Sequence, residues 1–190
     1  CECTSINGYL VGTCYDGNSV FNLLSKKDKG ESINLYKNDE KIWEITKQYN
    51  SEVFEDNESS LGYAIDVYQE SINKVFREYL VNYKFFKRVL ENYGFIELTQ
   101  DELLELGLKS STGMFSELFT SMKLDIQTSK KKLFGNAENM SDEEKTISFL
   151  NRYFIFKKNM NIDPDKIKDQ YNEPLTEDEK RMAEEILESI

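Results

Sequence analysis

The spacing of apolar residues along the chain changes several times between the two-residue repeat of a β-strand and the 3.6-residue repeat of an α-helix. The apolar run at 8–14 predicts a buried strand in a mixed or parallel sheet. Residues 16–19 supply turn and N-cap chemistry, and the apolar side chains at 20–24 predict a helix after them. Open α/β sheets bind ligands where a strand ends in a polar turn before a helix, so residues 13–16 are candidate binding residues.

Strict alternation predicts three further strands. Segments 32–36 and 41–47 flank a polar turn and predict a β-hairpin, and segment 63–68 predicts another strand. Residues 84–93 then place apolar side chains at helical spacing, and Gly94 follows as a C-terminal cap.

Shorter elements are predicted beyond Gly94. Segment 95–99 predicts a strand, and 101–106 predicts a short helix. Segment 114–132 predicts a longer helix whose methionines and leucines we expect in the core. It ends in Lys130-Lys131-Lys132, which is either a solvated helix end or a contact for phosphate.

The C-terminal part contains a second aromatic strand. A capping box at 141–144 predicts a short helix, and residues 151–158 predict the strand. Residues 1–158 are thus expected to form an α/β domain with a mixed sheet and flanking helices. The polar segment 159–174 holds both prolines and predicts a linker, and 175–190 predicts a capped C-terminal helix.

The stretch from Arg77 to Phe86 places one carboxylate, that of Glu78, among tyrosines and phenylalanines. A carboxylate framed by aromatic rings suits a flat ring that donates hydrogen bonds, and guanine is such a ring. The strand predicted at 151–158 would line the same pocket. The alternative is that Glu78 is a solvated charge beside core aromatic residues.

Composition excludes several classes of function. With 24 Lys and Arg against 35 Asp and Glu, the net charge is −11, which argues against a broad nucleic-acid surface and leaves room for a pocket for one terminal nucleotide. Histidine is absent from the sequence, which excludes Ser–His and Cys–His nucleophiles and His ligation of a metal. Cys1, Cys3 and Cys14 form no spaced framework, so we predict reduced thiols and no metal site.

The sequence has neither an apolar run near the roughly 18 residues that span a bilayer nor the pattern of a signal peptide. It begins without methionine, and we expect a fragment of a longer protein.

Four segments resemble the C-terminal half of an mRNA cap guanine-N7 methyltransferase, of the type found in capping enzymes of large DNA viruses. They are Gly8–Gly17, Arg77–Phe86, Ser111–Phe119 and Asn151–Lys158, and their order and spacing are more specific than any one of them. The resemblance implies a class I, Rossmann-like fold for residues 1–158. It also implies use of S-adenosylmethionine to methylate the 5′-terminal guanosine of capped RNA at N7.

By position, the resemblance implies roles for four residues. Glu78 matches the carboxylate that binds the Watson–Crick edge of guanine, and Tyr153 matches an aromatic residue of the cap pocket. Tyr15 and Asp16 match the lip after the strand, where cellular relatives carry Pro-Asn, and a tyrosine there would stack on a base. The family's glycine-rich cofactor turn and its upstream His-Tyr pair are missing, so we expect the S-adenosylmethionine site upstream of Cys1 and an inactive chain on its own.

The implied reaction requires no general base, so no side chain is assigned as catalytic. N7 of guanine has a free lone pair and no proton to remove, and the enzyme acts by positioning the reactants. A fixed carboxylate stabilises the positive charge that develops on the purine. Glu78 would accept hydrogen bonds from guanine N1–H and N2–H2, which adenine matches poorly.

The implied partners are the capped 5′ end of mRNA, the triphosphatase and guanylyltransferase domains of a capping enzyme, and a stimulatory subunit. The implied location is the cytoplasm for a viral protein and the nucleus otherwise. Two alternatives stay open: a class I methyltransferase half that acts on a small molecule or another RNA position, and a non-catalytic acidic interaction module.

Overall fold

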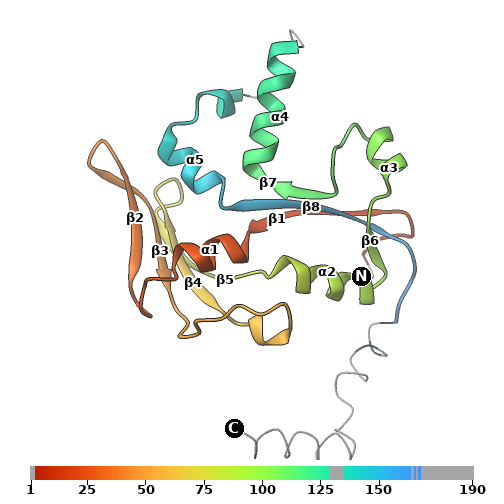
Figure 1. The fold of residues 1–190 in the computed structure, drawn as a ribbon, viewed down its shortest axis with the longest axis horizontal. Helices are drawn as coiled ribbons and strands as arrows, with labels where there is room; N and C mark the ends of the chain where they lie inside the picture. The colour runs from red at the N-terminus through yellow and green to blue at the C-terminus, as the bar shows by residue number, and fades with distance from the viewer. Residues whose placement is uncertain (1–2, 129–134, 164, 166, 168–190) are drawn as a thin grey trace, which may run out of the picture.

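Two four-stranded sheets form the framework of the computed structural model, which describes residues 3–128, 135–163, 165 and 167 (Figure 1). In the first sheet, β8 (Asn151–Lys158) is the central strand. It pairs antiparallel with β1 (Tyr9–Tyr15) along one edge, and with β6 (Phe95–Glu97) and β7 (Thr112–Met114) along the other. All three strand pairs in this sheet are antiparallel, so the expectation of a mixed or parallel sheet is wrong for it.

The two faces of this sheet differ in burial. Phe154 and Phe156 lie on one face, which packs against Phe86 and Leu90 of α2 (Tyr83–Asn92). That helix ends before Gly94, whose φ of 79° confirms the predicted C-terminal cap.

On the opposite face of the sheet, Val11 is 67% exposed. The strand predicted at 8–14 is confirmed, but the expectation that it is buried is wrong for this face, on which Tyr9, Val11 and Thr13 are all exposed.

The second sheet is an antiparallel meander in chain order. It consists of β2 (Ser32–Lys37), β3 (Glu40–Lys47), β4 (Ala64–Gln69) and β5 (Lys74–Tyr79). The predicted hairpin and the strand after it are thus confirmed. β5 is an edge strand of this sheet, and all six of its residues are exposed.

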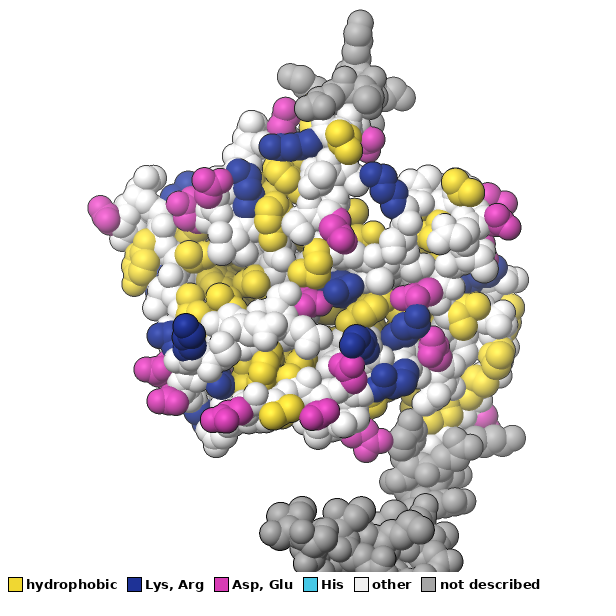
Figure 2. Space-filling view, in the orientation of Figure 1, with side chains coloured by type: hydrophobic (Ala, Val, Ile, Leu, Met, Phe, Trp, Pro, Cys, Tyr) yellow, Lys and Arg dark blue, Asp and Glu magenta, His cyan; other side chains and the backbone are white. Residues whose placement is uncertain are grey.

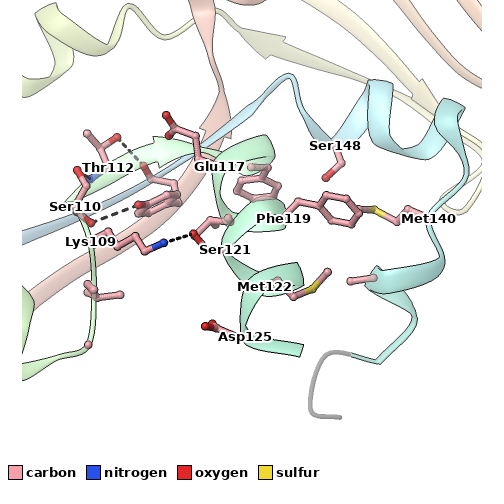
Figure 3. A pocket seen from close by; sticks show the side chains of 16 residues that line it. Lys109, Ser110, Thr112, Glu117, Phe119, Ser121, Met122, Asp125, Met140 and Ser148 are labelled. Carbon is pink, nitrogen blue, oxygen red and sulfur yellow. Dashed lines mark hydrogen bonds between the residues drawn. The ribbon is translucent and has the colours of Figure 1, made fainter. Parts of the chain in front are cut away.

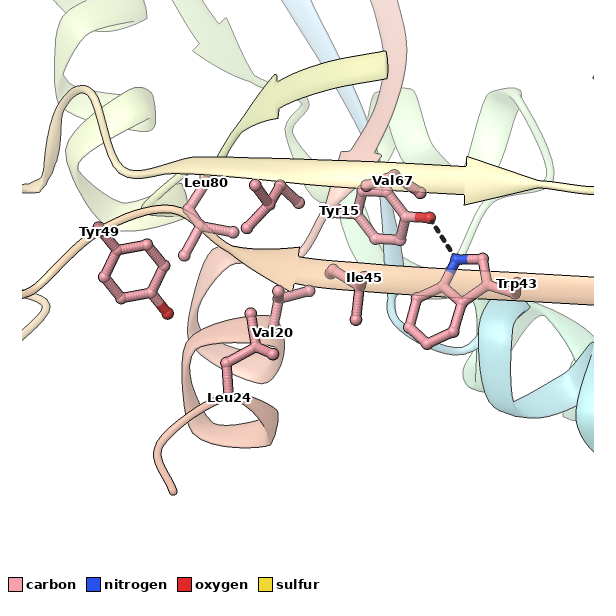
Figure 4. Packing of buried hydrophobic residues seen from close by; sticks show 9 residues of the cluster. Tyr15, Val20, Leu24, Trp43, Ile45, Tyr49, Val67 and Leu80 are labelled. Carbon is pink, nitrogen blue, oxygen red and sulfur yellow. Dashed lines mark hydrogen bonds between the residues drawn. The ribbon is translucent and has the colours of Figure 1, made fainter. Parts of the chain in front are cut away.

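One face of the meander forms the larger core. Trp43, Ile45 and Ile65 are almost completely buried there, and Val20 of α1 (Gly17–Leu23) packs onto them (Figure 4). Period-two alternation in the strands and the apolar stripe of α1 bring these side chains together.

The two sheets meet where β1 ends. Asp16 forms an isolated parallel bridge with Val81, and the Gly17 N–H donates to the Val81 carbonyl at 3.0 Å. A Cβ on Gly17 would lie 2.4 Å from that carbonyl oxygen, so this position requires glycine. The junction fixes the chain just after β5 against the turn between β1 and α1.

The remaining described elements surround the first sheet: α3 (Gln100–Glu105), α4 (Phe115–Thr128), α5 (Asp142–Ser148), and the 3-10 turns Glu58–Ser60 and Gly135–Asn139. The predicted capping box of α5 is confirmed. β7 was not predicted, because three residues are too few to show a period.

The helix predicted at 114–132 is confirmed as α4, but its predicted role in the core is wrong for Leu118, which is 42% exposed. Lys130–Lys132 lie outside the described residues. The linker at 159–174 is described only in part and the helix at 175–190 not at all, so both stay predictions.

The predicted combination of helices with β-sheets is confirmed, and the class I methyltransferase identity of the fold stays a prediction. None of the helices within the described ranges combines the length and the apolar character needed to cross a membrane.

Candidate functional site

Three strand ends converge on one edge of the molecule. The last residue of β1, Tyr15, pairs with Asn151 at the start of β8, and Thr13 pairs with Tyr153. Since Asp16 bridges Val81, the end of β5 comes to the same place. The fold therefore brings all four residues predicted from the sequence to one edge, although they come from three separate segments.

Glu78 occupies the edge strand β5 opposite Ile65. Side chains of directly paired residues point to the same face of a sheet, and Ile65 is fully buried in the core. Glu78 therefore faces the core side of the meander, at a position that the core does not cover. Its carboxylate forms no hydrogen bond or ion pair with the part of the chain that the structure describes. Partial burial raises the pKa of Glu78 above its ordinary value.

Tyr15 is buried rather than open to solvent as a lip residue would be. Its hydroxyl accepts a hydrogen bond from Trp43 Nε1 at 3.2 Å (Figure 4). Burial raises the pKa of Tyr15, the Trp43 bond opposes this shift, and the charge of Glu78 adds to it. The stacking of Tyr15 on a base stays a prediction.

Asp16 is also buried, and its two oxygens are used within the protein. Oδ1 accepts from the backbone N–H of Ser19 at 2.8 Å, which caps α1, and Oδ2 accepts from Arg152 Nε at 2.8 Å. Burial alone would raise the pKa of Asp16, but the bonds from Ser19 and Arg152 outweigh it and hold this pKa below its ordinary value. These contacts give Asp16 a structural role, and its predicted contact with guanine stays a prediction.

Arg152 organises this edge, and the sequence analysis did not single it out. Besides Asp16, its guanidinium binds Thr112 Oγ1 at 3.1 Å and lies over the Tyr83 ring, 4.6 Å from the centroid. One feature of the sequence could have pointed to Arg152, because a lone arginine inside an aromatic strand needs a buried partner for its charge. That partner could not be identified without the fold.

Tyr153 lines a cavity of about 860 Å³ on the open face of the first sheet (Figure 3). Its ring lies against Gly113, where a Cβ would come 2.9 Å from Tyr153 Cε1 and 2.5 Å from Glu117 Oε2. Burial raises the pKa of Tyr153, and the nearby Glu117 raises it further. Its hydroxyl contacts the Ser110 carbonyl at 3.4 Å.

The wall of this cavity is apolar towards α4 and α5. The apolar side chains in its lining include Phe115, Leu118, Phe119 and Met122 of α4, and Met140, which lies just before α5 (Figure 3). Among the described residues, Tyr153 and Glu117 belong to the lining and Glu78 does not. The structure thus places Tyr153 beside Glu117, and one pocket shared by Glu78 and Tyr153 stays a prediction.

Charge of either sign is dispersed over the face shown in Figure 2, where Lys and Arg side chains alternate with Asp and Glu.

The turn between β1 and α1 is closed, because Gly17 contacts Val81 and Asp16 is held by Arg152. A cofactor site upstream of Cys1 therefore stays a prediction.

No protein-family model matches the chain. Among curated proteins, the chain is similar to the "Probable mRNA-capping enzyme" of Acanthamoeba polyphaga mimivirus. The two are 29% identical over 188 residues, which cover 87% of this chain and 16% of that protein. The chain is thus related over most of its length to a protein named as a capping enzyme, and it spans only a small part of that protein.

Proposed function

We propose that this chain is the guanine-recognition part of an mRNA cap guanine-N7 methyltransferase. Its relationship to a mimivirus protein named as a capping enzyme supports a role in capping. The convergence of Glu78, Tyr15 and Tyr153 on one edge supports guanine as the ligand. In this proposal the chain works in the cytoplasm of a virus-infected cell, beside other capping domains.

The carboxylate of Glu78 carries this proposal. It faces the core side of a sheet, is partly desolvated, and has no internal partner in the described residues. Such a group has its lone pairs available for an external donor, and a charge-assisted hydrogen bond is stronger where water is partly excluded. Guanine offers two adjacent donors, N1–H and N2–H2, to the two oxygens of one carboxylate.

The aromatic residues would hold the ring of the base. Thr13 faces Tyr153, so Tyr15 is a diagonal neighbour of Tyr153 across the β1–β8 pair. Diagonal neighbours lie about 7–8 Å apart. In the proposal, one purine held by Glu78 contacts both rings, with Tyr153 stacking on it and Tyr15 supporting the carboxylate.

The contribution of these residues to the reaction is binding and electrostatic stabilisation. Holding the Watson–Crick edge at Glu78 leaves N7, on the opposite side of the purine, directed away from the carboxylate and accessible to a methyl donor. As N7 is alkylated the purine becomes cationic, and the negative charge of Glu78 favours that change. In this proposal the methyl donor binds to residues outside this chain.

Glu78→Gln tests this proposal because it keeps the shape of the side chain and removes its charge. In the full-length protein we expect kcat/KM for N7 methylation of GpppA-capped RNA to fall by about 10²-fold. Glu70→Gln is the matched control, since Glu70 is an exposed carboxylate in the turn after β4. Parent-like methylation by a correctly folded Glu78→Gln protein would rule out the proposed site. If the protein instead methylates a small molecule and cap analogues do not inhibit that reaction, it is another kind of methyltransferase.

A further inference from the structure

The edge strand β5 presents a second side chain beside Glu78. Phe76 pairs with Val67 in the same ladder in which Glu78 pairs with Ile65. Val67 and Ile65 are both buried in the core beneath α1. Paired residues point to the same face, so Phe76 and Glu78 lie side by side on the core side of the meander.

The core does not cover Phe76, although the side chain faces the core side. Phe76 is 44% exposed and is not among the residues that pack against the core cluster. A single exposed aromatic residue is common on protein surfaces and by itself means little. What distinguishes Phe76 is its register, because it is the next side chain along the strand from a carboxylate that has no partner in the described chain.

We propose that Phe76 forms an aromatic surface of the guanine site and stacks on the base whose edge Glu78 binds. This inference rests on the proposed function and adds a residue that selects for the base. Alternate residues of a strand lie about 6.5–7 Å apart on one face. A purine that is hydrogen-bonded to Glu78 therefore extends over the neighbouring ring.

The chemistry of the product strengthens this contact. Methylation at N7 gives the purine a positive charge, and the face of a phenyl ring attracts cations. Phe76 and Glu78 would then both stabilise the positive charge on the purine, the ring through its quadrupole and the carboxylate through its charge. A ring at this position favours a purine that becomes cationic over one that stays neutral.

Val75 provides a matched control on the opposite face of the same strand. It pairs with Tyr68 and is 63% exposed, so it resembles Phe76 in exposure and position but points away from Glu78. A general disturbance of the edge strand would affect both residues alike. A contact with the base would affect Phe76 alone.

The experiment compares Phe76→Ala, Phe76→Tyr and Val75→Ala in the full-length protein, with GpppA-capped RNA as substrate and m7GpppA as competing product. We expect Phe76→Ala to raise KM and the inhibition constant of m7GpppA by about 10-fold, as the loss of one stacking contact does. We expect a smaller change in kcat. Phe76→Tyr restores both constants, and Val75→Ala leaves them at parent values.

Two results would overturn the inference: parent-like constants in Phe76→Ala, or equal effects of Phe76→Ala and Val75→Ala. Thermal unfolding of each variant verifies that it is folded. If Glu78→Gln abolishes activity while Phe76→Ala does not weaken binding, the inference fails and the proposed function stands. If Glu78→Gln has no effect, the proposed function itself fails.

Discussion

Arg152 Nε donates a hydrogen bond to Asp16 Oδ2 at 2.8 Å, and these two residues lie 136 positions apart in the sequence. The ion pair joins the turn after β1 to the start of β8, while the other oxygen of Asp16 caps α1. One buried carboxylate thus fixes the edge on which Glu78, Tyr15 and Tyr153 converge.

Asp16→Asn should destabilise the protein by about 1–3 kcal/mol in urea unfolding at pH 7, because it leaves the partly buried Arg152 without its counter-charge. Asparagine still caps α1, so the substitution isolates the ion pair. Asp66→Asn breaks the exposed pair with Arg77 and is the control, with an expected cost below about 1 kcal/mol.

The pH dependence of the Asp16→Asn effect follows from the lowered pKa of Asp16. A carboxylate whose pKa is depressed by folding stabilises the protein above its unfolded pKa of about 3.9 and loses this contribution as the pH falls further. The difference between Asp16→Asn and the parent should therefore shrink below about pH 4. A constant difference down to pH 2 would exclude the ion pair as its cause.

Glu78→Gln should raise the melting temperature at pH 7, although it removes the proposed activity. Partial burial raises the pKa of Glu78, so its charged form costs free energy in the folded state. This cost is present above the folded pKa and disappears below the unfolded pKa of about 4.3, where we expect the variant and the parent to melt together.

Glu102→Gln gives the opposite sign and serves as the control for Glu78→Gln. Hydrogen bonds from Lys157 and from the backbone of Thr99 lower the pKa of Glu102. Its charge therefore stabilises the fold above about pH 4.3 and loses that effect as the pH falls. Differential scanning calorimetry should show a lower melting temperature for Glu102→Gln at pH 7. A drop of the same sign in Glu78→Gln would contradict the desolvation that raises the pKa of Glu78.

Two buried tyrosines should respond differently to removal of their hydroxyls. Tyr15→Phe leaves Trp43 Nε1 without an acceptor in the core and should cost about 1–3 kcal/mol. The Tyr49 hydroxyl is buried and has no hydrogen-bond partner among the described residues, so Tyr49→Phe should be neutral or stabilising. Denaturant unfolding measures both changes. Equal destabilisation by the two substitutions would disprove the assigned role of the Trp43 bond.

Gly113→Ala should weaken cap binding with little loss of stability. The new methyl group would come 2.9 Å from the Tyr153 ring and 2.5 Å from the flexible end of Glu117, so both side chains must move. We expect KM for capped RNA to rise about 5- to 10-fold as Tyr153 is displaced from its stacking position.

Gly12→Ala is the control for Gly113→Ala, because its methyl group would come 2.5 Å from Cζ of the buried Phe154. Here the surrounding core cannot move easily, and overpacking should cost about 1–3 kcal/mol of stability. Gly113→Ala variants with parent-like KM would show that Tyr153 does not contact the cap.

The sequence alone determined most of the local structure, because this structure depends on short periods and on caps. The hairpin, the Gly94 cap and the capping box at Ser141 were all predicted from neighbouring residues. Glu78 and Tyr153 were singled out as residues, but their distance from each other could not be predicted. No local pattern shows which strand ends will meet.

Only the tertiary structure decided the environments of the site residues. Tyr15 was expected at an open lip and lies buried against Trp43, and Asp16 is engaged by Arg152. Likewise, only the β4–β5 register shows that Phe76 accompanies Glu78 on one face. The physical reason is that burial and ion pairing depend on contacts between distant segments, whereas period and capping depend on residues a few positions apart.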